Sequence, residues 1–100
     1  MRYATLYSAR EFTPLPGCNQ VVVSHGMFMK PEFRGNGLGK SEQKASLDEM
    51  KFLGYDYAIC TVRADNDAQK KILLDSGWRQ LDSFVSSYTM NGVLIFGRVV

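Results

Sequence analysis

The chain has 100 residues, with 12 basic and 10 acidic side chains and a formal net charge of +2. This length suits one domain, and the hydrophobic content of 45% excludes an intrinsically disordered chain. No apolar run approaches the ~20 residues of a membrane span, and no basic stripe indicates nucleic-acid binding. The two cysteines, Cys18 and Cys60, have neither metal-site spacing nor the density of a disulfide scaffold. We therefore expect residues 1–100 to form one cytoplasmic domain that binds no metal, membrane or nucleic acid.

The first 30 positions predict two strands separated by a loop. Tyr3–Tyr7 has an alternating pattern that is typical of a strand. Two prolines and a glycine in Thr13–Gly17 predict a loop. Gln20–Lys30 is rich in Val, Phe and Met and predicts a second strand, in which Gly26 indicates a bulge or a close backbone approach.

The middle of the chain predicts two helices around one strand. Leu38–Leu53 has apolar residues at helical spacing, and Gly54 follows as a stop signal. Tyr55–Val62 is nearly continuously apolar, which predicts a central strand covered on both faces. Asp67–Ser76 predicts a second helix that ends at Gly77.

The end of the chain predicts a β-hairpin. Its strands are Gln80–Met90 and Val93–Val100, and Asn91-Gly92 between them is the strongest short signal for a two-residue turn. The order strand, helix, strand, helix, hairpin predicts an α/β (α+β) fold with a mixed sheet.

A glycine-rich turn, Pro31–Lys40, lies between the second predicted strand and the first predicted helix. Its three glycines allow the backbone to approach a ligand with its N–H groups turned one way. The positive end of the helix dipole follows, so the segment predicts a site for phosphate or pyrophosphate. Arg34 and Lys40 add positive charge. The alternative is a turn that serves only chain reversal.

Two common nucleotide-binding motifs do not fit this turn. The phosphate loop of nucleoside triphosphatases requires a glycine at position 34, which is Arg34. The dinucleotide-binding motif GxGxxG requires a glycine at position 40, which is Lys40.

The turn resembles the acetyl-coenzyme A loop of the GNAT superfamily of N-acetyltransferases, whose signature is Arg/Gln-x-x-Gly-x-Gly/Ala. Arg34, Gly37 and Gly39 match it in register. Family members also often carry an asparagine at the start of the next helix and a Gly-aromatic pair further on, as well as a final tyrosine-containing hairpin. These features are matched by Asn66, Gly77, Trp78, Tyr88, Asn91 and Gly92. The resemblance spans about residues 21–100.

The resemblance implies a GNAT-like, mostly antiparallel sheet with two main helices and a C-terminal hairpin. It also implies acetyl-CoA as cosubstrate. The turn would hold the pyrophosphate, and the backbone near Met27–Met29 would pair with the pantetheine arm beside a splayed next strand. The implied cofactor-binding residues are Met27, Phe28, Met29, Arg34, Gly35, Asn36, Gly37, Leu38, Gly39, Lys40 and Asn66.

Two residues are candidates for catalysis. His25 lies nine residues before Arg34, where one branch of the family has a histidine base, and its imidazole suits proton transfer near neutral pH. The alternative is a hydrogen-bonded histidine at a strand end. The usual general acid is a tyrosine seven residues after the asparagine, but that position is Leu73, which leaves Tyr88 as a substitute candidate with packing as its alternative role.

The resemblance also implies a shortened N-terminal acceptor side, because only about twenty residues precede Val21. A second copy or another protein would then complete the acceptor site. Two functions follow. The first is an N-acetyltransferase that transfers acetyl to a small-molecule or protein amine in a ternary complex. The second is a catalytically reduced GNAT-like protein that binds and regulates a protein partner.

Overall fold

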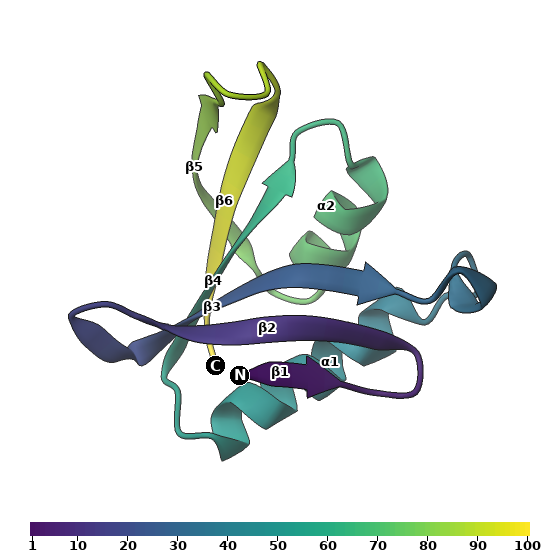
Figure 1. The fold of residues 1–100 in the computed structure, drawn as a ribbon, viewed down its shortest axis with the longest axis vertical. Coiled ribbons are helices and arrows are strands. Elements are labelled where there is room, and N and C mark those ends of the chain that lie inside the picture. The colour runs from purple at the N-terminus through teal and green to yellow at the C-terminus, as the bar shows by residue number, and fades with distance from the viewer.

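The computed structural model describes residues 1–100 as one six-stranded sheet with the order β1-β2-β3-β4-β6-β5 (Figure 1). The predicted mixed fold, with a mostly antiparallel sheet, two main helices and a C-terminal hairpin, is confirmed. The elements are β1 (Arg2–Ala4), β2 (Ser8–Leu15), β3 (Cys18–Met29), the short 3-10 helix η1 (Pro31–Phe33), α1 (Gly39–Phe52), β4 (Tyr57–Arg63), α2 (Asp67–Asp75), β5 (Arg79–Val85) and β6 (Gly92–Val99).

The N-terminal segment differs from the prediction, because it contains two strands rather than a strand and a loop. The backbone turns after Ala4, where the Thr5 hydroxyl accepts hydrogen bonds from the N–H groups of Tyr7 and Ser8. β2 then runs through most of the predicted loop Thr13–Gly17.

Proline is tolerated within β2 because one edge of the strand is open there. β1 pairs only with Ala9 to Glu11, so Pro14 has β3 on one side and no strand on the other. The actual turn is Pro16-Gly17, in which the glycine adopts a φ of +84°. A proline followed by a left-handed glycine is the expected pair for a type II turn.

The predicted irregularity at Gly26 is confirmed as a β-bulge. Glu11 pairs with His25 and Ala9 pairs with Phe28, so two residues of β3 oppose one residue of β2 at this point. Gly26 adopts a φ of +62°, which explains why glycine suits the position.

β3 and β4 are the only parallel neighbours in the sheet, and they pair over a short length. The paired residues are Val21–Val23 on β3 and Tyr57–Ile59 on β4, after which the two strands diverge (Figure 1). The connection between them runs through α1, as a parallel pair requires. The divergence leaves the edge of β3 beyond Val23 without a neighbouring strand on that side.

The core lies between the sheet and the two helices, which pack against each other. The buried apolar residues are Phe12, Val22, Met50, Ala58, Val62, Leu73, Trp78 and Phe96. β4 was predicted to be covered on both faces, and this is wrong at its far end. Ala58 and Val62 are buried toward the core, whereas Thr61 and Arg63 on the other face are exposed.

Both helices lie within a residue or two of their predicted bounds, and Gly54 and Gly77 follow them with φ of +91° and +84°. Neither helix has the length and apolar character needed to cross a bilayer.

The final hairpin is present, but its predicted two-residue turn is wrong. β5 ends at Val85, and a wider loop follows before β6. The Ser86 side chain accepts hydrogen bonds from the N–H groups of Tyr88 and Thr89, and its own N–H donates to the carbonyl of Asn91. Because serine organises the loop, the left-handed residue is Met90 (φ 59°) and not Asn91 or Gly92.

Candidate functional site

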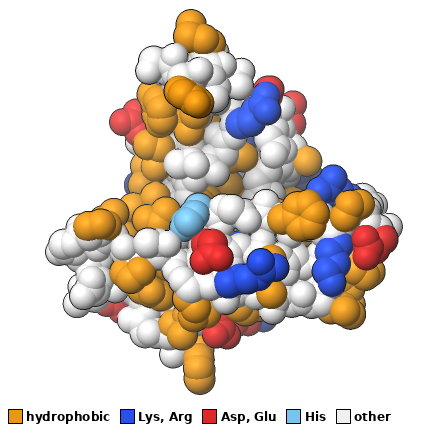
Figure 2. All heavy atoms as spheres, in the orientation of Figure 1, with side chains coloured by type: hydrophobic (Ala, Val, Ile, Leu, Met, Phe, Trp, Pro, Cys, Tyr) orange, Lys and Arg blue, Asp and Glu red, His pale blue; other side chains and the backbone are white.

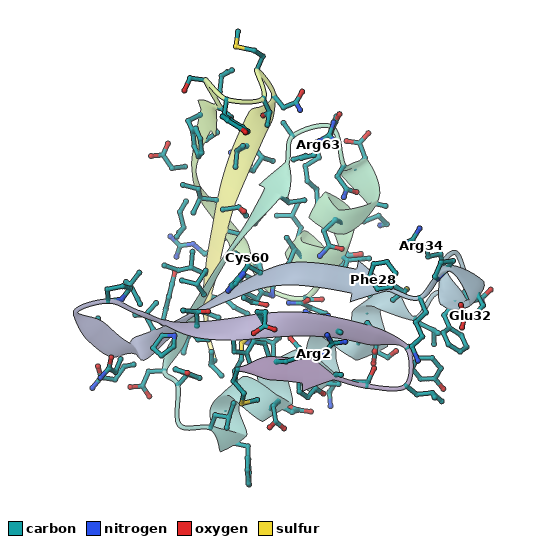
Figure 3. The ribbon with its side chains drawn as sticks, in the orientation of Figure 1. Arg2, Phe28, Glu32, Arg34, Cys60 and Arg63 are labelled. Carbon is teal, nitrogen blue, oxygen red and sulfur yellow. The ribbon has the colours of Figure 1, made fainter.

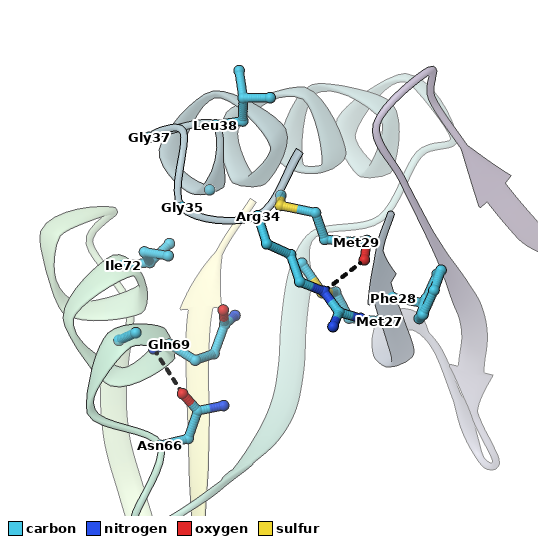
Figure 4. A pocket seen from close by; sticks show the side chains of 12 residues that line it. Met27, Phe28, Met29, Arg34, Gly35, Gly37, Leu38, Asn66, Gln69 and Ile72 are labelled. Carbon is cyan, nitrogen blue, oxygen red and sulfur yellow. Dashed lines mark hydrogen bonds between the residues drawn. The ribbon is translucent and has the colours of Figure 1, made fainter. Parts of the chain in front are cut away.

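An open cleft of about 460 Å³ lies where β3 diverges from β4 (Figure 4). One wall is the end of β3, the second is the glycine-rich turn, and the third is the first half of α2. The cleft is lined by Met27, Phe28, Met29, Arg34, Gly35, Gly37, Leu38, Gly39, Asn66, Ala68, Gln69 and Ile72. Nine of the eleven residues predicted to bind a cofactor therefore meet here, and three residues of α2 that the sequence did not indicate join them.

The glycine-rich turn presents backbone N–H groups that the protein itself leaves unused. Gly35 and Gly37 have left-handed φ values of +77° and +73°, and Leu38 at the start of α1 provides no side-chain cap. No backbone N–H from Gly35 to Ser41 donates to an acceptor in the chain. Unsatisfied N–H groups at a helix N-terminus form a site for an anion.

Gly39 is required for a different reason, since its φ is ordinary. A Cβ at this position would lie 2.4 Å from Cδ1 of Ile72 on α2. The glycine therefore lets the first turn of α1 approach α2 at the cleft, which both Gly39 and Ile72 line.

Arg34 is held at the rim of the cleft. Its Nε donates to the carbonyl of Met29 at 3.0 Å, and its guanidinium lies 5.3 Å from the centre of the Phe28 ring (Figures 3 and 4). The remaining guanidinium nitrogens make no hydrogen bond within the chain and place positive charge beside the glycine-rich turn.

Three other predicted residues are engaged within the protein. Asn66 caps α2 by accepting a hydrogen bond from the N–H of Gln69 at 3.1 Å, and it still lines the cleft (Figure 4). Lys40 lies outside the cleft and forms an ion pair with Asp75 at 3.2 Å, which lowers the pKa of that carboxyl and links the two helices. Asn36 also lies outside the cleft wall and reaches the carbonyl of Glu32 at 3.5 Å.

A smaller cavity of about 120 Å³, called here the inner cavity, lies next to the cleft in the gap between β3 and β4. Met27 and Gln69 line both spaces and mark the junction. The other residues of the inner cavity are Arg10, Ser24, His25, Gly26, Gln43, Cys60, Thr61, Leu73 and Trp78.

The two candidate catalytic residues lie in different places. His25 lines the inner cavity from the exposed face of the sheet, and its Nε2 lies 2.8 Å from the Thr13 hydroxyl (the pale blue side chain in Figure 2). Tyr88 is 96% exposed in the loop between β5 and β6 and lines neither the cleft nor the inner cavity. Leu73, at the position of the family tyrosine, is 1% exposed and lines the inner cavity.

Sequence reasoning missed a buried polar group on β2. Arg10 is only 4% exposed, and its Nη1 donates to Gln43 and Ser46 of α1, both at 3.2 Å. Beside it, Glu42 accepts hydrogen bonds from the hydroxyls of Ser8 and Thr5. Ser8, Arg10 and Phe12 share the inner face of β2, a pattern that becomes readable only once residues 8–15 are known to form a strand.

Cys60 is half-buried, whereas Cys18, the other free cysteine, is exposed. Burial raises the pKa of its thiol from 9.0 to about 12, although the charge of Arg10 opposes this shift. The thiol is therefore protonated near neutral pH, and no three metal-ligating side chains gather near it or elsewhere in the chain.

This shift predicts a loss of stability at high pH. Unfolded Cys60 releases its proton near pH 9, whereas the folded thiol retains it to about pH 12, so raising the pH between these values favours unfolding. We expect the free energy of unfolding to fall over this window and to fall less steeply in Cys60→Ser. Burial also raises the pKa of Tyr3, so the free energy of unfolding of Cys60→Ser still falls somewhat as the pH rises. Equal slopes from urea unfolding of both proteins would contradict the assignment.

Comparison with known proteins identifies the fold. No protein-family model and no curated protein matches the sequence. Solved structures do match. The ribosomal-protein-S18-alanine N-acetyltransferase of Escherichia coli is 14% identical, with a TM-score of 0.77 over 94% of this chain and 61% of its own. A GCN5-related N-acetyltransferase from Kribbella flavida is 17% identical, with a TM-score of 0.79 over 94% and 60%. Spermidine N-acetyltransferase from Vibrio cholerae, solved with CoA and spermine, is 14% identical, with a TM-score of 0.83 over 95% and 59%.

These likenesses show that the chain has a GNAT-like fold. The chain spans about 60% of the length of the three solved structures that it matches. The predicted resemblance is confirmed at the level of the fold, and it extends over nearly the whole chain rather than residues 21–100 alone.

Proposed function

We propose that this chain binds acetyl-CoA in the cleft and transfers the acetyl group to an amine. The observation that carries the proposal is the run of unused backbone N–H groups from Gly35 to Ser41 at an uncapped helix N-terminus. In a turn that binds no ligand, a capping side chain would be expected to accept hydrogen bonds from some of these N–H groups, as Asn66 does for α2. A pyrophosphate supplies acceptors for several of them at once.

The cleft has a second feature that fits coenzyme A. Beyond Val23 the edge of β3 facing β4 has no strand partner, and Met27–Met29 lie on this edge within the cleft. An extended arm carrying amides can pair with such an edge as an added strand would. The two features are adjacent, because the glycine-rich turn begins with the short η1, which closely follows the end of β3.

The chemistry requires two proton movements. The bound thioester supplies an activated acyl group; the amine nitrogen forms a bond to its carbonyl carbon, and the bond from that carbon to sulfur breaks. The amine loses a proton, and the departing thiolate gains one. We assign the first proton to His25, which is exposed and lines the inner cavity. Leu73 cannot donate the second, so that proton comes from solvent.

His25→Ala is expected to lower kcat by about 100-fold, the usual scale for loss of one acid–base group, and to remove the acid limb of the pH–rate profile. The KM for acetyl-CoA is expected to change little, because His25 does not line the cleft. Thr13→Val is the matched control, since it removes the hydrogen-bond partner and keeps the imidazole. Wild-type kcat at every pH in His25→Ala would eliminate this residue as the base.

The direct test of the proposed function is calorimetric titration of the purified chain with acetyl-CoA. Micromolar binding is the expected result. Release of free CoA thiol is then measured against a panel of amines that includes polyamines and peptides with an N-terminal alanine, because the structural neighbours are named for such acceptors. A folded chain that does not bind acetyl-CoA would overturn the proposal.

A second candidate function is a catalytically reduced protein that regulates a partner. Leu73 in place of a tyrosine favours it, and so does the apolar tip of the final hairpin. This tip exposes Phe84, Val85, Tyr88 and Met90. Retained partner binding by a chain that does not bind acetyl-CoA would favour this function over the first.

A further inference from the structure

The buried guanidinium of Arg10 lines the inner cavity, and no acidic group of the protein forms an ion pair with it. None of the ion pairs in the chain includes Arg10, although its side chain is 96% removed from solvent. The guanidinium makes only two hydrogen bonds, both from Nη1 and both to neutral side chains. Burial lowers the pKa of Arg10, which reflects the cost of placing this charge away from water.

The groups around Arg10 do not supply the missing negative charge. Glu42 is the carboxylate whose charge acts on Arg10 most strongly, but its Oε1 accepts hydrogen bonds from Ser8 and Thr5 and lies beyond ion-pair distance. Cys60 carries a protonated thiol near neutral pH, because burial raises its pKa to about 12. Tyr3 is likewise neutral, since its pKa is raised by burial and by Glu42.

Two hydrogen-bond donors on residues that line the inner cavity have no acceptor within the chain. They are Nε of Arg10 and Nε1 of Trp78, and both are sealed from solvent. Trp78 is 2% exposed, so its donor is buried as completely as that of Arg10. Buried donors without partners are rare because each loses its hydrogen bonds to water and gains none in the protein. Both residues line the inner cavity, so an acceptor that enters it could reach these donors once the surrounding side chains shift.

The position of the inner cavity indicates what enters it. Met27 and Gln69 line both the cavity and the cleft, so the two spaces are neighbours at the gap between β3 and β4. A thioester whose pyrophosphate sits at the glycine-rich turn and whose arm follows β3 would direct its acyl end toward this junction. The cavity volume of about 120 Å³ is roughly four times the ~30 Å³ share of a water molecule, which leaves room for several atoms.

We propose that the inner cavity receives the acyl group and that Arg10, with Trp78 as a second donor, selects an acyl chain that ends in a carboxylate. This inference rests on the proposed function, because the acyl chain arrives on coenzyme A, and it narrows the donor: the cleft binds acetyl-CoA, and the inner cavity makes a carboxylate-ending acyl-CoA the preferred donor. A malonyl or succinyl group would bring two carboxylate oxygens and a negative charge to the buried guanidinium, whereas acetyl offers only its thioester carbonyl oxygen and no charge. The transfer reaction is unchanged: the new amide forms at the thioester carbonyl, and the distal carboxylate stays on the product.

The test is calorimetric titration of the full chain with free CoA, acetyl-CoA, malonyl-CoA, succinyl-CoA and isovaleryl-CoA. Isovaleryl-CoA matches malonyl-CoA in shape and lacks the charge. We expect malonyl-CoA or succinyl-CoA to bind at least tenfold more tightly than isovaleryl-CoA. Arg10→Met is expected to remove this preference and to leave the affinity for free CoA within about twofold of wild type.

A second variant tests the inference in case Arg10→Met does not fold. Trp78→Phe keeps the ring and removes the Nε1 donor, and it is expected to reduce the preference about threefold. Binding of CoA and acetyl-CoA without any preference for the charged thioesters overturns the inference and leaves the proposed function intact. A preference that persists in a folded Arg10→Met variant also overturns it. Absence of binding by every ligand, free CoA included, overturns the proposed function and this inference together.

Discussion

Gly37→Glu is expected to weaken acetyl-CoA binding by at least 100-fold while the chain stays folded. Gly37 lines the cleft and adopts a φ of +73°, and a Cβ built there meets no atom within 4 Å. The substitution therefore causes no clash. It places a carboxylate among the N–H groups that would hold pyrophosphate, and the left-handed backbone adds strain of about 1–2 kcal/mol for a residue with a Cβ. Calorimetry with acetyl-CoA measures the loss.

Gly17→Glu is the matched control for this experiment. Gly17 has a φ of +84° and a Cβ position that is also free of contacts, but it lies in the β2–β3 turn outside the cleft. Both variants gain the same charge and a similar strain, so thermal unfolding is expected to shift equally in the two. Only Gly37→Glu is expected to lose the ligand. Equal affinity in the two variants would show that the glycine-rich turn does not hold coenzyme A.

The parts of the fold that the sequence predicted correctly depend on local signals. α1 and α2 have apolar residues at helical spacing and a glycine after the last turn, and both signals lie within each segment itself. The bulge at Gly26 was predictable for the same reason, because a glycine inside a strand pattern has few other roles.

β2 was missed because its stabilising interactions are distant in sequence. Arg10, Glu11 and Pro14 interrupt any apolar pattern in residues 8–15. Arg10 is accommodated by Gln43 and Ser46, more than thirty positions along the chain. Pro14 is accommodated because β1 is short and leaves that edge open. The sequence of residues 8–15 alone does not indicate either interaction.

The candidate site also has one part that local sequence signals predict and one part that they do not. The glycine-rich turn was predictable because its N–H groups and helix dipole are consecutive in sequence. The inner cavity was not, since it forms only when β2, β3, β4 and the two helices come together around the gap between β3 and β4. The wider hairpin loop had a local cause, the Ser86 side chain, but Asn91-Gly92 was the stronger known signal and favoured the wrong turn.

Phe12→Ala is expected to lower the free energy of unfolding by about 3–5 kcal/mol, the cost of removing a buried phenylalanine. Phe12 is 0% exposed in the core and stacks on Tyr3 of β1 with ring centres 5.4 Å apart. The substitution opens a void at the point where β1, β2 and the core meet. Total stability of a domain this size is about 5–15 kcal/mol, so a melting temperature lower by roughly 12 °C or more is expected.

Phe52→Ala makes the same chemical change where burial is absent. Phe52 is the last residue of α1 and is 84% exposed, so its substitution is expected to change stability by about 0.5 kcal/mol or less. The comparison tests whether residues 8–15 belong to the folded core, because a peripheral or frayed β2 would make the two variants equally stable. The same strand carries Arg10 to the inner cavity, so a large effect of Phe12→Ala beside a negligible effect of Phe52→Ala would show that the backbone bearing Arg10 belongs to the folded core.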